Sequence, residues 1–202
     1  MKNFHSKIPV VILAAGESKR MGTPKGLLDY KGKRFILSQV EKIQKMGLSK
    51  IIIVLGKSKE DYLQKAPEIK QYNIKTNPHP EKGIFSSIQI GLSGLSEDVF
   101  GVFILPVDVP CPQERVWKAM LQNMKSSEVN VVVPSYEGKK GHPVLLSLGF
   151  IRYILACKSD SRLDHEIHKQ EKQQRVKIIS VKDSTILLNL NTIEDWESFK
   201  VS

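Results

Sequence analysis

The stretch VILAAGESKRMGTPKG, residues 11–26, begins as an apolar strand and ends in a loop rich in small and basic residues. Similar apolar runs recur along the chain and alternate with segments in which apolar residues repeat every three or four positions. This alternation is typical of parallel strands connected by helices that cover both faces of a sheet. The sequence therefore predicts one α/β domain over residues 1–202, with three Rossmann-like layers and a mostly parallel sheet.

Seven segments have the strand pattern, and several are apolar throughout, as strands covered on both faces are. They are residues 8–14, 51–56, 73–77, 99–107, 129–135, 143–147 and 176–181. Helices with one apolar stripe are expected between them. Their stripes are Ile36, Val40 and Ile43, then Ile84, Ile88, Leu92 and Leu95, then Val116, Met120 and Met124. A last helix is expected after Thr192, with Trp196 and Phe199 on its buried side.

Composition limits the possible functions. The chain has 31 Lys plus Arg against 21 Asp plus Glu, a formal net charge of +10, which favours anionic ligands, although a solvated lysine surface also explains it. No basic segment has interleaved aromatic residues, so nucleic acid is not an expected partner. Cys111 and Cys157 are too isolated for a disulfide framework or a zinc site. Without a cleavable signal or an apolar run of roughly 18 residues, we expect a cytoplasmic protein with no membrane partner.

The loop that follows the first strand is the first candidate site, because ligands bind at the carboxyl ends of parallel strands. Ala14, Ala15 and Gly16 are too small to keep a ligand away from the backbone, so their N–H groups can face an anion. Arg20 offers a planar fork to phosphate oxygens, and Lys25 offers a compact charge. The loop therefore predicts a polyphosphate site, although neither the Walker pattern nor G-x-G-x-x-G is present.

The second candidate is Asp108, which lies between two prolines in LPVDVP, at the end of the predicted strand 99–107. An aspartate in this place can ligate a hard cation that bridges phosphate oxygens, because Mg²⁺ takes oxygen ligands. A turn-forming aspartate is the alternative explanation. Together with the polyphosphate loop, the position favours a metal ligand.

The string LAAGxSxRMGxPK, residues 13–25, resembles the signature of the MobA-like nucleotidyltransferases and, within them, of the molybdenum cofactor cytidylyltransferases. The resemblance implies a GT-A-like nucleotidyltransferase fold. It also implies Mg²⁺-dependent transfer of a nucleoside monophosphate from an NTP to a phosphorylated acceptor, with release of pyrophosphate. Carried over by position, it implies three roles: a nucleotide-lining backbone, phosphate-binding cations and a principal metal ligand. The residues are, in that order, Leu13, Ala14, Ala15 and Gly16, then Arg20 and Lys25, then Asp108.

Three later segments extend the resemblance. The segment NPHPEKGIFSS implies that Asn77 and Ser87 line the nucleotide, and GHPV implies that His142 faces the acceptor. The string NLNTIED has Asn189 where relatives usually have the aspartate that is their second metal ligand. Since asparagine offers a carbonyl oxygen but no charge, the metal affinity should fall, or another carboxylate must serve.

The resemblance also suggests which NTP is the donor and which molecule is the acceptor. Ala15 stands where relatives with guanine specificity usually have glycine, which favours CTP as donor. The favoured acceptor is the molybdopterin cofactor, with a molybdenum enzyme as downstream partner. A sugar phosphate, phosphocholine or another small phosphate ester stays open as acceptor. The uncharged Asn189 also leaves open a non-catalytic protein that binds nucleotide or cofactor.

Overall fold

The computed structural model describes residues 8–18, 21–124 and 128–201. The strands of its main sheet are β1 (Val10–Ala14), β4 (Ile51–Leu55), β5 (Asn73–Thr76), β6 (Gly101–Pro106), β7 (Val131–Tyr136), β8 (Lys139–Lys140), β9 (Val144–Ser147) and β10 (Val176–Ser180). Their order is β10-β7-β9-β6-β1-β4-β5, and β8 pairs with β7. All seven predicted strands are present, and their ends differ from the prediction by at most two residues.

The direction of the strands confirms the predicted, mostly parallel sheet. Strand β1 runs parallel to β4 and β6, β5 is parallel to β4, and β10 is parallel to β7. Strand β9 lies antiparallel between β6 and β7. The short connection 137–143 explains this exception, because a parallel crossover needs about a dozen residues or more.

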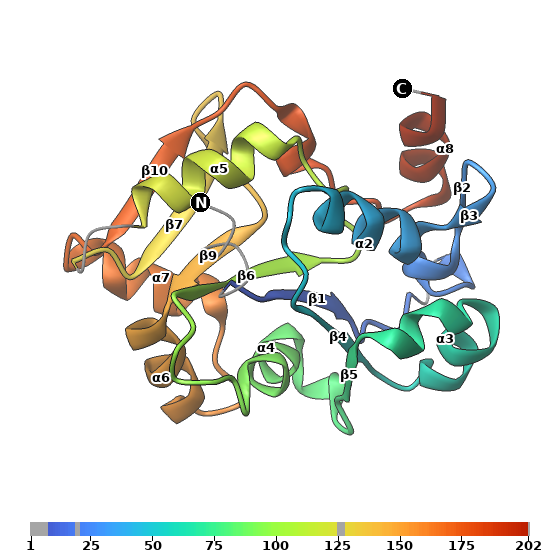
Figure 1. The fold of residues 1–202 in the computed structure, drawn as a ribbon, viewed down its shortest axis with the longest axis horizontal. Helices are drawn as coiled ribbons and strands as arrows, with labels where there is room; N and C mark the ends of the chain where they lie inside the picture. Colours follow the sequence, from blue (N-terminus) through green and yellow to red (C-terminus); the bar gives the residue numbers. More distant parts are fainter. Residues whose placement is uncertain (1–7, 19–20, 125–127, 202) are drawn as a thin grey trace.

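Helices cover both faces of the sheet, which confirms the three layers (Figure 1). One face carries α2 (Phe35–Lys45), α3 (Lys59–Lys65) and α5 (Glu114–Asn123), and the other carries α4 (Ile84–Leu92), α6 (Leu148–Ala156) and α7 (Leu163–Lys172). Successive residues of β1 alternate between the two cores, because strand side chains point to opposite faces. None of the described helices is long and apolar enough to cross a membrane.

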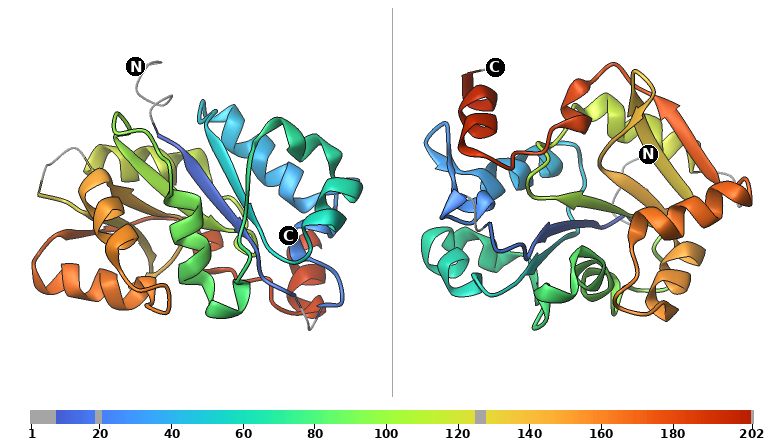
Figure 2. Two further views of the ribbon diagram at one scale, coloured as in Figure 1. Left: turned by 90° about the horizontal axis from the view of Figure 1, so that it is seen from below. Right: turned by 180° about the vertical axis from the view of Figure 1, so that it is seen from behind.

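Short 3₁₀ turns connect these elements: η2 (Lys25–Leu27), η3 (Pro67–Gln71), η4 (Pro80–Lys82) and η5 (Ser184–Leu187). A small hairpin of β2 (Asp29–Tyr30) and β3 (Lys33–Arg34) follows η2, and the C-terminal helix α8 (Ile193–Val201) packs on it (Figure 2). The Trp196 ring centroid lies 5.0 Å from that of Phe35 and 6.2 Å from that of Tyr30. This aromatic contact brings the segment before α8 beside the end of β6, where the Leu190 N–H donates to the Asp108 carbonyl at 2.9 Å.

Candidate active site

Two cavities open at the carboxyl ends of β1 and β6, the edge of the sheet where ligands are expected. The first has a volume of about 690 Å³ and the second about 580 Å³. They share Leu13, Ile84 and Pro106 in their walls, so they are contiguous. The predicted core position of Ile84 is wrong: its side chain is 55% exposed, because the first turn of α4 projects beyond the sheet into both cavities.

The end of β1 lines the first cavity through Leu13, and the loop that follows lines it through Ala15 and Gly16. Ala14 is placed differently, since its side chain lies in the core on the opposite face of the sheet. A Cβ at Gly16 would meet open space, so the backbone there is accessible to a ligand. Arg20, predicted to bind phosphate, lies outside the described residues.

The polar centre of the first cavity is formed by Lys25, Asp108 and Asn191, which come from three distant parts of the chain. The Lys25 ammonium donates to Asp108 Oδ2 at 2.8 Å and to Asn191 Oδ1 at 2.6 Å. The side chains of Lys25 and Asp108 are only 14% and 24% exposed. A partly buried charge pair of this kind is screened by salt much less than one on the surface.

Asn191, rather than Asn189, reaches this centre. Asn189 is exposed, donates to the Leu187 carbonyl at 3.3 Å and lines neither cavity. The predicted metal-binding position of Asn189 therefore does not match the geometry. Leu190, between the two asparagines, is buried, and its N–H donates a hydrogen bond to the Asp108 carbonyl. This bond fixes the segment so that Asn191, and not Asn189, lines the cavity. The string NLNTIED indicated the right segment, but the choice between its asparagines depends on this tertiary contact.

The oxygens of Asp108 and Asn191 fit a hard divalent cation, because both converge on one positively charged atom, the Lys25 ammonium. Among the residues that the structure describes, no cluster of three or more His, Cys, Asp or Glu could hold a metal. A cation at Asp108 would therefore need further oxygens from water or phosphate. This donor set suits a divalent cation that keeps several ligands of its own.

The other predicted nucleotide residues have separate roles. Ser87 lines the first cavity. Asn77 is buried; it donates to Ser86 Oγ at 2.8 Å and to Ser87 Oγ at 2.9 Å, and it accepts from the His79 N–H at 2.9 Å. Asn77 therefore braces the connection between β5 and α4 and positions Ser87. Sequence reasoning missed Lys57, which lies at the cavity and pairs with Glu17 at 2.7 Å.

The second cavity has an apolar floor and a charged rim. The floor consists of Ile88, Ile104, Val133, Val144 and Ile167. On the rim, the Arg162 guanidinium contacts both carboxylate oxygens of Asp164, at 3.0 and 2.7 Å. Lys140 and His168 both pair with Glu171, His168 at 3.3 Å.

His142, predicted to face the acceptor, lies in the wall of the second cavity. Its Nδ1 is the one buried side-chain nitrogen or oxygen without a hydrogen-bond partner in the described part of the chain. Burial lowers the pKa of His142, and the nearby Asp108 charge opposes this only in part. A neutral imidazole at neutral pH can position a ligand but holds no proton to give as a strong acid.

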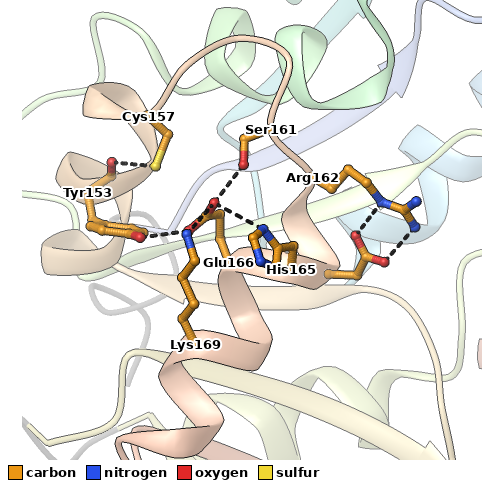
Figure 3. A network of polar contacts seen from close by, with 8 residues as sticks. Tyr153, Cys157, Ser161, Arg162, His165, Glu166 and Lys169 are labelled. Carbon is orange, nitrogen blue, oxygen red and sulfur yellow. Dashed lines mark hydrogen bonds and ion pairs between the residues drawn. The ribbon is translucent and has the colours of Figure 1, made fainter.

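A buried carboxylate, Glu166, holds the segment beside this cavity (Figure 3). It accepts from Tyr153 and Ser161 hydroxyls at 2.6 Å each and from the Lys169 ammonium at 2.9 Å. Burial alone would raise the pKa of Glu166, but the hydrogen bonds from Ser161, Tyr153 and Lys169 lower it to about 2. The network ties α6 to α7 and fixes the loop that carries Arg162 to the second cavity.

The segment HEIH, residues 165–168, lies in α7 and contains both exposed and buried side chains. His165 and His168 are exposed, whereas the Glu166 side chain is 3% exposed. The pattern is one residue short of the H-E-x-x-H zinc motif, and each imidazole lies near a carboxylate: His165 Nδ1 is 3.7 Å from Glu166 Oε1, and His168 Nδ1 is 3.3 Å from Glu171 Oε2. Glu166 therefore has a structural role, because its hydrogen bonds hold α6, α7 and the loop between them together. A spacing rule for metal ligands would not predict this role.

Comparison with known proteins identifies the family and agrees with the fold. Residues 10–176 match the model of the MobA-like NTP transferase domain. A "Probable molybdenum cofactor guanylyltransferase" of Natranaerobius thermophilus is 31% identical over 131 residues, which are 65% of this chain and 62% of that protein. The match thus spans less than two thirds of that relative.

Two solved structures share the fold. Rv0371C of Mycobacterium tuberculosis H37Rv, described as a complex with manganese, has a TM-score of 0.76 and 19% identity, covering 96% of this chain and 98% of its own. A nucleotidyl transferase from Methanothermobacter thermautotroptrophicus has a TM-score of 0.79 and 16% identity, covering 96% of each chain. At these identities, the likeness establishes the fold alone.

Proposed function

Because this chain belongs to the MobA-like NTP transferase family, we propose that it moves a nucleoside monophosphate from an NTP to a phosphorylated acceptor and releases pyrophosphate. The observation that carries the proposal is the convergence of Lys25, Asp108 and Asn191 in a cavity at the end of β1 and β6. One cation and two oxygen ligands in a partly buried site suit a metal-bound polyphosphate.

The residues of the first cavity would hold the NTP. Asp108 and Asn191 would ligate a divalent cation, which would neutralise charge on the phosphates and on the departing pyrophosphate. Lys25 would leave its two oxygen partners and contact phosphate oxygens as negative charge develops on them. The small loop residues Ala15 and Gly16 allow the nucleotide to approach the backbone.

The acceptor would enter from the second cavity and meet the NTP where Leu13, Ile84 and Pro106 join the two spaces. An acceptor phosphate oxygen attacks the α-phosphorus as the bond to the β-phosphate bridging oxygen breaks. Such a phosphate is already ionised near neutral pH, so it needs no strong base, and catalysis consists of positioning and charge stabilisation. The unpartnered His142 would position the acceptor.

Two observations point to different bases in the donor NTP. Ala15, in place of a glycine, favours CTP, whereas the Natranaerobius relative is named as a guanylyltransferase. A direct competition between CTP and GTP, with saturating acceptor and measured nucleotide products, decides between them.

The acceptor that we propose first is the molybdopterin cofactor, which the name of the relative supports, and a molybdenum enzyme would then use the product. A sugar phosphate or phosphocholine is the alternative within the same chemistry. A non-catalytic nucleotide- or cofactor-binding protein is the alternative outside it, because neither Asn189 nor Asn191 adds a second carboxylate to Asp108.

The test is to incubate the full chain with each NTP, Mg²⁺ or Mn²⁺ and a panel of phosphorylated acceptors, and to measure pyrophosphate. Release that needs NTP, metal and acceptor together supports the transferase. Nucleotide binding without release for any acceptor, molybdopterin included, would instead support the non-catalytic protein.

A further inference from the structure

The floor of the second cavity offers no hydrogen bond from a side chain. Its residues Ile88, Ile104, Val133, Val144 and Ile167 come from α4, β6, β7, β9 and α7, and all belong to one buried core cluster. Transfer of a hydroxyl group onto such a surface removes it from water without a new partner, which is unfavourable. Transfer of a methylene group onto it is favourable.

The backbone around this cavity is also largely engaged. The Gly141 N–H donates to the Pro134 carbonyl, and the His142 N–H donates to the Ile186 carbonyl, each at 2.9 Å. A Cβ at Gly141 would collide with the Ile186 carbonyl, so this wall is packed tightly on η5. Apart from the unpartnered Nδ1 of His142, the wall therefore offers little hydrogen bonding to a polyhydroxylated ligand.

The charged groups of the rim are paired with one another. Arg162 is held by Asp164 through two hydrogen bonds, and Figure 3 shows its guanidinium directed away from the Glu166 network. Lys140 is paired with Glu171. A sugar hydroxyl that used these groups would have to displace a carboxylate, and a neutral hydroxyl competes poorly with a charged partner.

From the apolar floor and the paired rim, we propose a further activity, which rests on the proposed function: the protein nucleotidylates simple phosphate monoesters whose organic part is apolar. The phosphate lies at the junction of the cavities, and the alkyl or aryl part lies on Ile88, Ile104 and Val133. One acceptor oxygen bonds to the α-phosphorus, pyrophosphate leaves, and the product is an alkyl or aryl ester of a nucleoside 5′-diphosphate. No oxidant, reductant or other co-reactant is needed.

The activity should follow the apolar area of the acceptor. Burial of each methylene group is worth about a fourfold gain in kcat/KM for as long as the cavity is being filled. Its volume of about 580 Å³ is within the range of small-molecule sites. We expect a rise through ethyl, butyl and hexyl phosphate, followed by a plateau or decline for longer chains.

The first experiment measures pyrophosphate release by the full chain with its NTP, Mg²⁺ and these n-alkyl phosphates. Hexyl phosphate and glucose 6-phosphate form a matched pair, because both carry six carbons and one phosphate and differ chiefly in the hydroxyl groups and ring. The proposal requires hexyl phosphate to exceed glucose 6-phosphate at least tenfold in kcat/KM. Equal values, or a preference for the sugar, would overturn it.

A pair of variants tests the location. Val133 lines the cavity, whereas Val131 lies two residues earlier on β7, belongs to the same core cluster and does not line it. Val133→Thr places a hydroxyl in the floor at nearly constant volume and should lower kcat/KM for hexyl phosphate several-fold, with little change for ethyl phosphate. Val131→Thr controls for loss of stability and should leave the ratio of the two acceptors unchanged.

Binding measurements separate this inference from the proposed function. Calorimetric titration with hexyl phosphate and with glucose 6-phosphate, in the presence of a non-hydrolysable NTP analogue, measures the affinity of the second cavity for each ester without any transfer reaction. Selective binding of hexyl phosphate without turnover would overturn the proposed transfer to alkyl phosphates, although the preference of the cavity for apolar esters would stand. Turnover with molybdopterin or a sugar phosphate, and none with alkyl phosphates, would retain the transferase and reject the further activity.

Discussion

The two cavities are neighbours with opposite chemistry. In the first, Lys25, Asp108 and Asn191 form a partly buried polar centre from three distant segments. In the second, five core side chains form the floor, and the charges stay at the rim. Under the proposed function, the fixed charges of the first cavity would bind the group that reacts, and the apolar area and shape of the second would select the acceptor.

The largest expected effect comes from the charge of the first cavity. Asp108→Asn should lower kcat about a thousandfold, because it removes the single carboxylate that would hold the cation in a preorganised site. Steady-state pyrophosphate release measures the loss, and circular dichroism should show an unchanged fold. A loss below tenfold would mean that the metal is held elsewhere and that the polar centre is only structural.

The next effect compares two lysines of the first cavity. Lys25→Met should lower kcat/KM for the NTP about a hundredfold, because Lys25 is a partly buried cation at the proposed phosphate position. Lys57→Met should change it less than about threefold, since Lys57 is 61% exposed and its ion pair with Glu17 is well solvated. The two variants remove the same charge, so equal losses would contradict a specific role for Lys25.

A smaller effect concerns the support of the second cavity. Glu166→Gln should lower the free energy of unfolding by about 1–2 kcal/mol and raise the acceptor KM, leaving the NTP KM unchanged. The folded pKa of Glu166, about 2, is below its ordinary value of 4.5, so its contribution is present above pH 4.5 and is lost as the pH falls toward 2. Urea unfolding at several pH values should show this loss in the wild type and less of it in the variant.

The matched control for that experiment is Glu197→Gln. Glu197 is an exposed carboxylate of α8 that pairs with Lys200, and its loss should change neither stability nor acceptor KM appreciably. If Glu166→Gln raised both substrate KM values alike, the network would stabilise the whole domain rather than one cavity.

The smallest effect is the pH dependence that His142 causes. Its folded pKa is lowered, so below its ordinary value of 6.5 the unfolded chain binds a proton that the folded chain does not. Stability should therefore fall as the pH is lowered from 7 to 6, by less than about 1 kcal/mol, and this part should vanish in His142→Gln. Thermal unfolding at the two pH values measures it, and an unchanged slope in the variant would place the proton uptake elsewhere.

Most of the fold was predictable because its signals are local. The apolar runs of β1 and β4 and the stripes of α2 and α5 follow from residue types and spacing. The antiparallel direction of β9 was not predicted, since a run of apolar residues contains no information about the direction of its neighbours. The exposure of Ile84 was missed for a similar reason: the helical period places it correctly on a face, but not beyond the edge of the sheet.

The candidate site was predictable only in part. Asp108 lies just after the end of β6, and Lys25 lies in η2, in the segment that follows β1, so sequence position predicted that both would be at one edge of the sheet. Asn191 was missed in favour of Asn189, although both stand in the same short string. Glu166 was missed because its hydrogen-bond partners Tyr153 and Ser161 meet it only after α6 and α7 have packed.

Residue types and their spacing were enough to predict the layered α/β architecture and the family. Those properties depend on periodicity and on contiguous motifs, which folding does not rearrange. The tertiary structure alone decided that Lys25, Asp108 and Asn191 meet, and that one cavity is polar while its neighbour is apolar. Lys25 and Asn191, for example, are 166 positions apart in the sequence. They meet because the aromatic residues of α8 pack on the hairpin and α2, which brings the segment before α8 to the cavity.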